Sequence, residues 1–310
     1  TSALAPIGKN PGTSRVNNNE SWNGSAWSEV ADVNTSRRDG GGTGASNTNA
    51  IIFGGFEADS PPGSQSAKTE VFNGSSWSEK GDLSTARSTS GSAGITSTAA
   101  LFFGPPAKTE SWNGAAWTEV AELNTERQYS GGAGAYTAAL AIGGDVDPPV
   151  TAVTEFWNGT TWTEIADLAT ARRQNFGSGL STAALASGGY TTTQVANTEE
   201  FTAPAVFSKK VEGQLYFNST TNTFKETLLD VPAGTWAAGG HLNTAKYQLG
   251  TAGTQTAALA FGGSSPPFTA TNESYNGTAW SEEADLTAQR DGLGSAGTQT
   301  AALGFGGQYP

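Results

Sequence analysis

The sequence predicts an all-β fold, a six-bladed β-propeller with four antiparallel strands in each blade, from three observations. One motif, an aromatic pair around an Asn-Gly or a related turn, recurs six times along 310 residues. Neighbouring copies lie 40 to 50 residues apart, except for one interval of 74. The chain also contains 41 glycines, many at repeated offsets. These features are typical of short strands joined by turns in a propeller.

The copies of the motif align on their second tryptophan. The aligned residues are Trp27, Trp77, Trp117, Trp162, Trp236 and Trp280. A blade buries its faces only against its neighbours, so we expect these side chains to pack between adjacent sheets. Flat indole rings can also stack on sugars, but their repetition favours a core role. Their hairpin partners Trp22, Trp112 and Trp157 are expected to be partly exposed.

The last copy shows how the strands of a blade are assigned. Residues 290–297 (RDGLGSAG) are rich in glycine, which suits the crowded innermost strand. In the copy before it, residues 256–263 (TAALAFGG) form an apolar second strand that ends at a Gly pair. Residues 271–277 and 279–286 then form the outer hairpin, with Asn276-Gly277 in a type I′ turn.

The two ends of the chain are complementary halves of a blade. The sequence opens with an outer hairpin at residues 20–30 and finishes with an inner strand pair at residues 290–307. Pairing between these segments would complete a sixth blade and remove the exposed sheet edges of an open array. We therefore predict one domain over residues 1–310, a ring closed by N-terminal outer and C-terminal inner strands.

A Gly doublet after an apolar strand, followed by an aromatic residue and a tryptophan, resembles the Kelch repeat. The doublets are Gly54-Gly55, Gly143-Gly144, Gly188-Gly189, Gly262-Gly263 and Gly306-Gly307, with Gly104-Pro105 in the second copy. The wording T-E-x-W-N-G-x-x-W-x-E, followed by T-A-A-L-x-x-G-G, also resembles Kelch-like structural proteins of marine bacteriophages. This resemblance implies a Kelch-like propeller and a structural role in a virion.

Composition excludes several classes of partner. Lys and Arg number 16 against 28 Asp and Glu, a net charge of −12, so we expect no nucleic-acid partner. The absence of cysteine rules out disulfides and thiolate metal sites. No apolar run approaches the roughly 20 residues of a membrane helix, so we expect no membrane insertion.

A recurring cation follows each outer hairpin. The aligned residues are Arg38, Arg87, Arg127, Arg173, Lys246 and Arg290. One interpretation is a cationic ring around the channel mouth that binds an anion. The favoured interpretation is that each cation pairs with the acid that precedes each hairpin, namely Glu20, Glu70, Glu110, Glu155, Glu199 or Glu200, and Glu273.

The sequence offers little for catalysis, so we predict a protein that is not an enzyme and holds no cofactor or metal. The Kelch-related copper oxidases use Tyr, His and Cys, whereas this chain has one histidine, His241, and no cysteine. His241 also stands where the other copies have Asp or Glu. Asp145 and Asp147 could bind a cation, but a solvated loop explains them better.

Loops on one face of the propeller vary most. The connections between strands two and three emerge beside those that lead to the next blade. The former span residues 56–67, 105–107, 145–152, 190–197 and 264–270. Variable loops on a rigid scaffold commonly carry recognition. The predicted binding residues are Phe56, Asp59, Asp145, Asp147, Tyr190 and Phe268.

One copy carries an insertion. Phe201 and Trp236 lie 35 residues apart where other copies have five, so residues 202–234 are predicted to form an inserted hairpin. It resembles an element of phage tail-fibre proteins. Its apolar residues Tyr216, Phe217 and Phe224 are expected to pack on the propeller or to dock a neighbouring virion subunit.

Two classes of function are therefore open. The first is a non-catalytic virion protein of a phage tail or fibre, outside the cell, whose loop face recognises a host surface glycan or protein. The alternative is a cytoplasmic Kelch-type adaptor that binds another protein. The phage resemblance favours the first.

Overall fold

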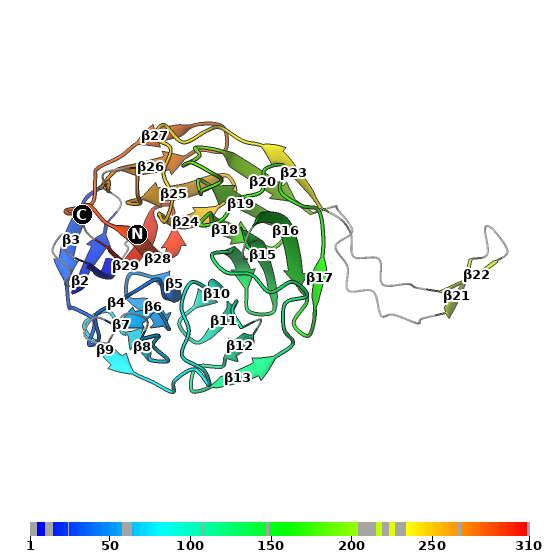
Figure 1. Ribbon diagram of the computed structural model, residues 1–310, viewed down its shortest axis with the longest axis horizontal. Helices are drawn as coiled ribbons and strands as arrows, with labels where there is room; N and C mark the ends of the chain where they lie inside the picture. Colours follow the sequence, from blue (N-terminus) through cyan, green and yellow to red (C-terminus); the bar gives the residue numbers. More distant parts are fainter. Residues whose placement is uncertain are drawn as a thin grey trace.

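The chain forms a ring of small antiparallel sheets around a central axis (Figure 1). The computed structural model describes residues 5–9, 15–23, 25–57, 64–106, 108–146, 149–203, 215–218, 223–226, 234–265 and 268–308. Within these ranges the secondary structure is β-strand and turn, without a helix. The prediction of an all-β propeller with antiparallel four-stranded blades is confirmed.

Five sheets have four strands each and are numbered here as blades I to V. Blade I contains β5 (Gly41–Ser46), β6 (Asn49–Phe53), β8 (Thr69–Phe72) and β9 (Trp77–Glu79). Blade II contains β10 (Gly91–Thr96), β11 (Ala99–Phe103), β12 (Thr109–Trp112) and β13 (Trp117–Val120). Blade III contains β14 (Gly131–Ala135), β15 (Ala138–Asp145), β16 (Val150–Trp157) and β17 (Trp162–Glu164).

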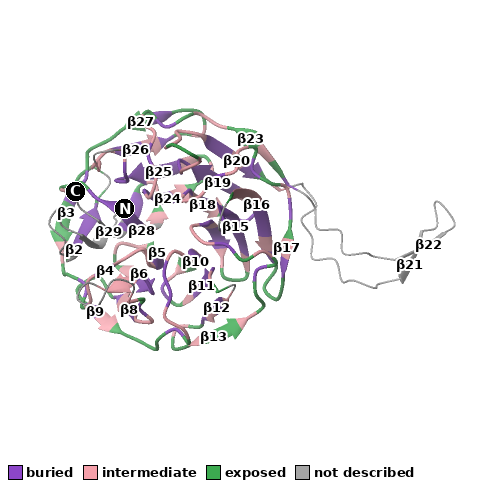
Figure 2. Ribbon diagram, in the orientation of Figure 1, coloured by how far each residue is buried: buried purple, intermediate pink, exposed green. Residues whose placement is uncertain are grey.

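The remaining two blades follow the same order from the axis outwards. Blade IV contains β18 (Phe176–Leu180), β19 (Ala183–Ser187), β20 (Thr198–Thr202) and β23 (Thr235–Ala238). Blade V contains β24 (Gly250–Thr254), β25 (Ala257–Phe261), β26 (Asn272–Tyr275) and β27 (Trp280–Glu282). Figure 2 shows buried residues concentrated in the middle strands and exposed residues along the outer rim.

The prediction of a sixth four-stranded blade is wrong. The chain ends form two separate sheets, together called the closing sector. One is the order β1 (Ala5–Lys9), β2 (Arg15–Trp22), β3 (Trp27–Val30), and the other pairs β28 (Asp291–Thr298) with β29 (Ala301–Gln308). The physical reason is β1, which pairs with β2 at Ala5↔Glu20 on the edge that a second strand occupies in the blades. The predicted pairing of the outer hairpin with the C-terminal strands is thus replaced by pairing with β1.

The closing sector nevertheless completes the ring. β29 lies against β1 and β2, and β28 lies between the innermost strands β24 and β5 of blades V and I. Trp27 packs on Phe261 of blade V with ring centroids 5.3 Å apart. Blades II and III make the same contact, since Trp162 lies 5.0 Å from Phe103. The ends are therefore joined by side-chain packing rather than by one continuous sheet.

The outer hairpins do not contain the predicted type I′ turn. Trp112 pairs with Trp117, so the loop has four residues, and only its glycine, Gly114, has a positive φ. The carboxamide oxygen of Asn113 accepts the N–H groups of Ala115 and Ala116 at 3.0 and 2.9 Å. The asparagine is selected because its side chain closes the turn, and the glycine because the backbone is left-handed there.

The tryptophans form the core between neighbouring sheets, but the prediction of partly exposed hairpin partners is wrong. Trp22, Trp112 and Trp157 are at most 2% exposed, whereas Trp117 and Trp236 of the second position are half-buried. The second tryptophan instead reaches the preceding sheet through its indole N–H. Trp117, for example, donates to the hydroxyl of Thr69 in blade I at 2.8 Å.

The Gly doublets mark close approaches between sheets. The second glycine donates its N–H to the carbonyl of the recurring cation that follows, as for Gly144 and Arg172 at 2.9 Å. A Cβ on Gly143 would lie 2.6 Å from the same carbonyl oxygen, and φ is +57°. In the second copy Pro105 has no N–H to donate, so the departure from the pattern removes one such bond.

The long interval in the fifth copy of the motif lies between two paired strands of blade IV. Phe201 of β20 pairs with Trp236 of β23, as the aromatic pair does in the other blades. Within the intervening segment, β21 (Leu215–Asn218) and β22 (Thr223–Glu226) pair antiparallel, as expected for a hairpin. The side chains of Tyr216, Phe217 and Phe224 lie outside the described part of the structure. Their packing stays a prediction.

Blades IV and V share a hydrogen bond that responds to alkaline pH. The hydroxyl of Tyr275 donates to Glu200 at 2.5 Å, and burial, followed by this bond, raises the pKa of Tyr275 to about 12. The ordinary tyrosine value is 10.0. Between these values the folded state keeps a proton that the unfolded state has lost, so the free energy of unfolding falls as pH rises.

We expect the Tyr275→Phe variant to show a shallower loss of stability than the parent between about pH 10 and 12. The measurement is denaturant unfolding at several alkaline pH values. Tyr136→Phe, at an exposed tyrosine, is the matched control and should keep the parent slope. Identical slopes for the Tyr275→Phe variant and the parent would contradict the assignment.

Candidate binding face

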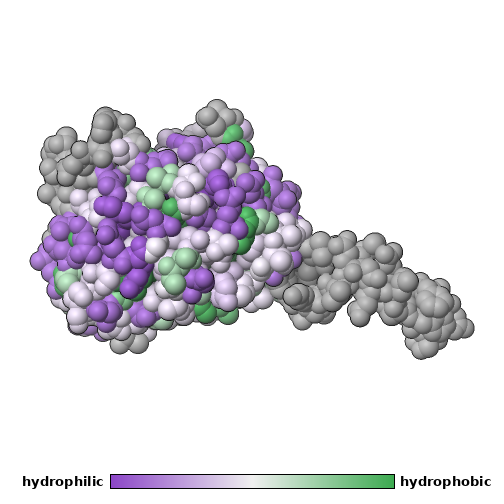
Figure 3. All heavy atoms as spheres, turned by 90° about the horizontal axis from the view of Figure 1, so that it is seen from below, coloured by the Kyte–Doolittle hydropathy of each residue, from purple (hydrophilic) through white to green (hydrophobic). Residues whose placement is uncertain are grey.

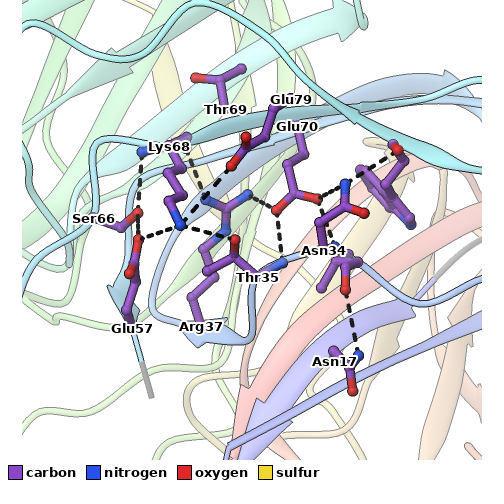
Figure 4. A network of polar contacts seen from close by, with 12 residues as sticks. Asn17, Asn34, Thr35, Arg37, Glu57, Ser66, Lys68, Thr69, Glu70 and Glu79 are labelled. Carbon is purple, nitrogen blue, oxygen red and sulfur yellow. Dashed lines mark hydrogen bonds and ion pairs between the residues drawn. The ribbon is translucent and has the colours of Figure 1, made fainter. Parts of the chain in front are cut away.

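In each blade, a chain segment leads into the innermost strand. A buried ion pair with a glutamate on the third strand fixes this segment in place. In blade I, Glu70 accepts a bond from Arg37 at 2.9 Å and from the N–H groups of Asn34 and Thr35 at 2.8 and 3.2 Å (Figure 4). Both charged side chains are at most 1% exposed. The charges are compensated as buried charges require.

The same pair recurs around the ring. The pairs are Arg37–Glu70, Arg87–Glu110, Arg127–Glu155, Arg172–Glu199, Lys246–Glu273 and Arg290–Glu20. Burial lowers the pKa of Lys246, while the carboxylate of Glu273 at 3.0 Å opposes the shift. The interpretation as structural ion pairs is confirmed, and these side chains are not available to an anion in the channel.

In two of the six ion pairs, the buried cation lies one residue before the one predicted from the sequence. Arg37 and Arg172, rather than Arg38 and Arg173, occupy the buried positions. The second arginine of each pair lies on the face that carries the variable loops. Only one arginine of each Arg-Arg pair can reach the buried glutamate. The second arginine therefore indicates a surface role, which we did not predict from the sequence.

A ring of left-handed residues surrounds the axis on this face. The five blades and the closing sector, together six units, each contribute one residue with φ between 53° and 64°. These residues are Asp39, Thr89, Tyr129, Gln174, Gln248 and Gly292. Neighbouring members are joined by backbone bonds, such as the N–H of Gln174 to the carbonyl of Tyr129 at 2.8 Å. Positive φ is unusual for a tyrosine. The bonds between units hold Tyr129 in this conformation.

The variable loops lie beside this ring. Short bridges pair Arg38 with Phe56, Gln128 with Asp145, Arg173 with Tyr190, and Tyr247 with Ser264. Each bridge joins a connection between strands two and three to the segment that enters a unit. The expectation that both sets of loops share one face is therefore confirmed.

Three neighbouring bridges bring five side chains together in what we call the Arg173 cluster: Tyr129, Asp145, Arg173, Tyr190 and Tyr247. The Arg173 guanidinium is 2.6 Å from the Asp145 carboxylate. Its central carbon lies 5.3 Å from the Tyr190 ring centroid and 5.8 Å from that of Tyr129. Tyr190 and Tyr247 meet edge to face at 5.5 Å. The side chain of Arg173 is 33% exposed, so the cluster is reachable from solvent.

The cluster borders a cavity of about 360 Å³ on the axis. The walls are innermost strands of small residues, which leave space where the blades converge. The mouth at the loop face is lined by Asp39, Thr89, Tyr129, Gln174 and Gln248. At the far ends of these strands, Ile95 and Leu180 also line the cavity.

Of the predicted binding residues, the structure gathers some and not others. Asp145 and Tyr190 belong to the Arg173 cluster, whereas Phe56 lies in blade I beneath Arg38, whose guanidinium carbon is 5.0 Å from its ring. Phe268 is half-buried beside Ser264 in blade V. Asp59 and Asp147 lie outside the described residues. None of these placements tests a binding role.

Other residues have less to offer. His241 is exposed, in the segment between β23 and β24. In the described part of the chain, no three His, Cys, Asp or Glu side chains gather as a metal ion would require. Among the same residues, no helix is long and apolar enough to cross a membrane. The rim seen in Figure 3 has scattered hydrophobic residues between polar ones rather than one large apolar patch.

The fold and this face define a class of protein, an all-β propeller with a cavity on its axis and variable loops around one mouth. No protein-family model and no curated protein matches the sequence.

Proposed function

We propose that this protein is a non-catalytic binding protein of a phage virion, associated with the tail or a fibre, that recognises a host surface glycan or protein through its loop face. The Arg173 cluster is the observation that carries the proposal. Its three half-buried tyrosines offer apolar faces with polar tips, and the Arg173–Asp145 pair offers hydrogen bonds between them.

The rigid ring supports this role. Buried ion pairs and interlocked tryptophans repeat in every unit, whereas the loops on one face differ in length and composition. A binding surface on a fixed frame loses little conformational entropy on association. The site on the loop face requires neither a nucleophile nor a cofactor.

Assignment to a virion depends on the resemblance of the repeated motif to Kelch-like proteins of marine bacteriophages. Other virion subunits are proposed to dock on the β21–β22 hairpin. The second candidate is a cytoplasmic Kelch-type adaptor, which the same loop face would also suit. Neighbouring genes separate the two, because genes for phage structural proteins cluster.

Changing Tyr190 and Tyr247 to serine together should lower binding to host cells about tenfold or more. Each aromatic contact contributes roughly 0.5–1.5 kcal/mol beyond the area that it buries. The measurement is adsorption of the labelled protein to a panel of marine bacteria, with thermal unfolding of each variant. Tyr136→Ser, an exposed tyrosine in the turn after β14 at the opposite face, is the control. Adsorption equal to that of the parent would refute the assignment of the loop face.

A further inference from the structure

The turns opposite the loop face carry no charged residue. They join the two innermost strands of each unit and the outer strands of each hairpin, and together we call them the turn face. The inner turns are residues 47–48, 97–98, 136–137, 181–182, 255–256 and 299–300, and the outer turns are residues 23–26, 73–76, 113–116, 158–161 and 276–279. The 28 acidic and 16 basic residues of the chain all lie outside these turns.

The inner and outer turns form one continuous surface. A Cβ on Gly114 of an outer turn would lie 3.5 Å from the Cβ of Thr98 in the inner turn of the same blade. Between blades I and II, the N–H of Ser97 donates to the side chain of Asn49 at 3.2 Å. Every inner turn also ends in an exposed threonine, namely Thr48, Thr98, Thr137, Thr182, Thr256 and Thr300. The turn face is therefore neutral but rich in polar groups.

Three large hydrophobic side chains are exposed on the turn face. Ile95 is 52%, Tyr136 42% and Leu180 52% exposed, and they lie at the inner hairpins of the successive blades II, III and IV. In the described part of the chain, the other exposed large hydrophobic residue is Val146, in a variable loop. Exposed apolar side chains that gather on one face indicate an interaction surface.

The polar groups of this surface select a second copy of the chain. A hydroxyl or a carboxamide both donates and accepts hydrogen bonds, so identical groups can pair with each other. Charged groups cannot pair with their own copies, and a net charge of −12 makes two chains repel. The turn face avoids this repulsion locally, and it offers no charge by which a different partner would be oriented.

The order of the hydrophobic residues agrees with two-fold symmetry. In a symmetric contact between copies, residue i meets residue j and residue j meets residue i. A two-fold axis in the plane of the contact, through blade III, places blade III on blade III and blade II on blade IV. Ile95 then meets the partner's Leu180, and the two Tyr136 rings meet at the axis.

We propose that this protein forms a two-fold dimer, turn face against turn face, centred on Tyr136. The dimer goes beyond the proposed function and does not depend on it. The loop faces then point away from each other, so one dimer presents a binding face at each end. Because the apolar patch is small, the contact belongs to the weak class that dissociates on dilution. In dilute protein its residues are ordinary surface residues.

The first test introduces a thiol into the full chain, which contains no cysteine. Tyr136→Cys should form a disulfide-linked dimer under mild oxidation, because the axis brings the two thiols within bonding distance. Ile95→Cys should cross-link only when it is combined with Leu180→Cys. Val146→Cys, on the loop face, is the matched control and should stay monomeric on a non-reducing gel.

The second test measures association by sedimentation over a range of concentrations. Leu180→Glu should raise the dissociation constant of the dimer at least about tenfold, because it places a carboxylate in a contact between acidic chains. Val146→Glu should keep the constant of the parent. Added salt should preserve or strengthen the association of the parent, since it screens the repulsion between the chains.

Any of three results would overturn the inference. One is a parent protein that sediments as a monomer at every concentration. Another is cross-linking of Val146→Cys as complete as that of Tyr136→Cys. The third is association of Leu180→Glu with the dissociation constant of the parent. Adsorption to host cells tests the loop face separately, so the proposed function and the dimer can fail independently.

Discussion

Glu20→Gln is expected to lower the free energy of unfolding of the whole ring by about 3–5 kcal/mol, as removing one partner of a buried ion pair does. Glu20 lies on β2 and pairs with Arg290, 270 residues away along the chain. It also accepts the N–H of Thr287 at 3.1 Å. The substitution leaves a buried guanidinium without its counter-charge at the point where the two chain ends meet.

The matched control is Glu29→Gln on the paired strand β3. Glu29 stands opposite Glu20 in the register but is exposed, so the change should be within about 0.5 kcal/mol. Denaturant unfolding followed by tryptophan fluorescence measures both. Equal midpoints for Glu20→Gln and Glu29→Gln would show that the closing ion pair contributes little.

Trp112→Ala is the second substitution with a large expected effect, a loss of about 3–5 kcal/mol. The indole is 0% exposed and packs with Ile51 and Phe53 of blade I as well as with Phe102 of its own blade. Its Nε1 donates to the carbonyl of Ser97 at 3.0 Å. Truncation therefore opens a cavity between two blades and leaves the Ser97 carbonyl without this bond.

Ile95→Ala in the same blade is the control, because Ile95 is 52% exposed. Its expected effect is within about 0.5 kcal/mol. The two variants are compared by thermal and denaturant unfolding. A loss below 1 kcal/mol for Trp112→Ala would contradict the assignment of this residue to the core.

Much of the fold could be predicted from the sequence because its determinants are local and repeated. The alternation of small and apolar residues in segments such as Ala257–Phe261 identifies strands, and the Asn-Gly pairs locate the turns. The turn type was wrong, since the Asn113 side chain stabilises a four-residue loop. Burial of Trp112 was also missed, because which indole faces inward depends on the register of the sheet.

The count of blades depended on a segment outside the repeated motif, and the site depended on contacts distant in sequence. Nothing in the motif reveals that β1 would take the free edge of β2. Alignment alone could not decide between Arg37 and Arg38, because either can be placed at the cation position. The Arg173 cluster joins residues from three units, and the pairing of Asp145 with Arg173 follows from the bridges between loops. Only the assembled ring brings the innermost strands of different blades together around one cavity.

The central claim is that the chain ends close a single cooperative ring through Glu20 and Arg290. Native-state hydrogen exchange of Glu20→Gln against the parent tests it most directly. We predict that amides of β14 and β15 in blade III lose protection by the same free energy as those of β2 and β29. Loss confined to the closing sector, with blade III protected as in the parent, would contradict the claim.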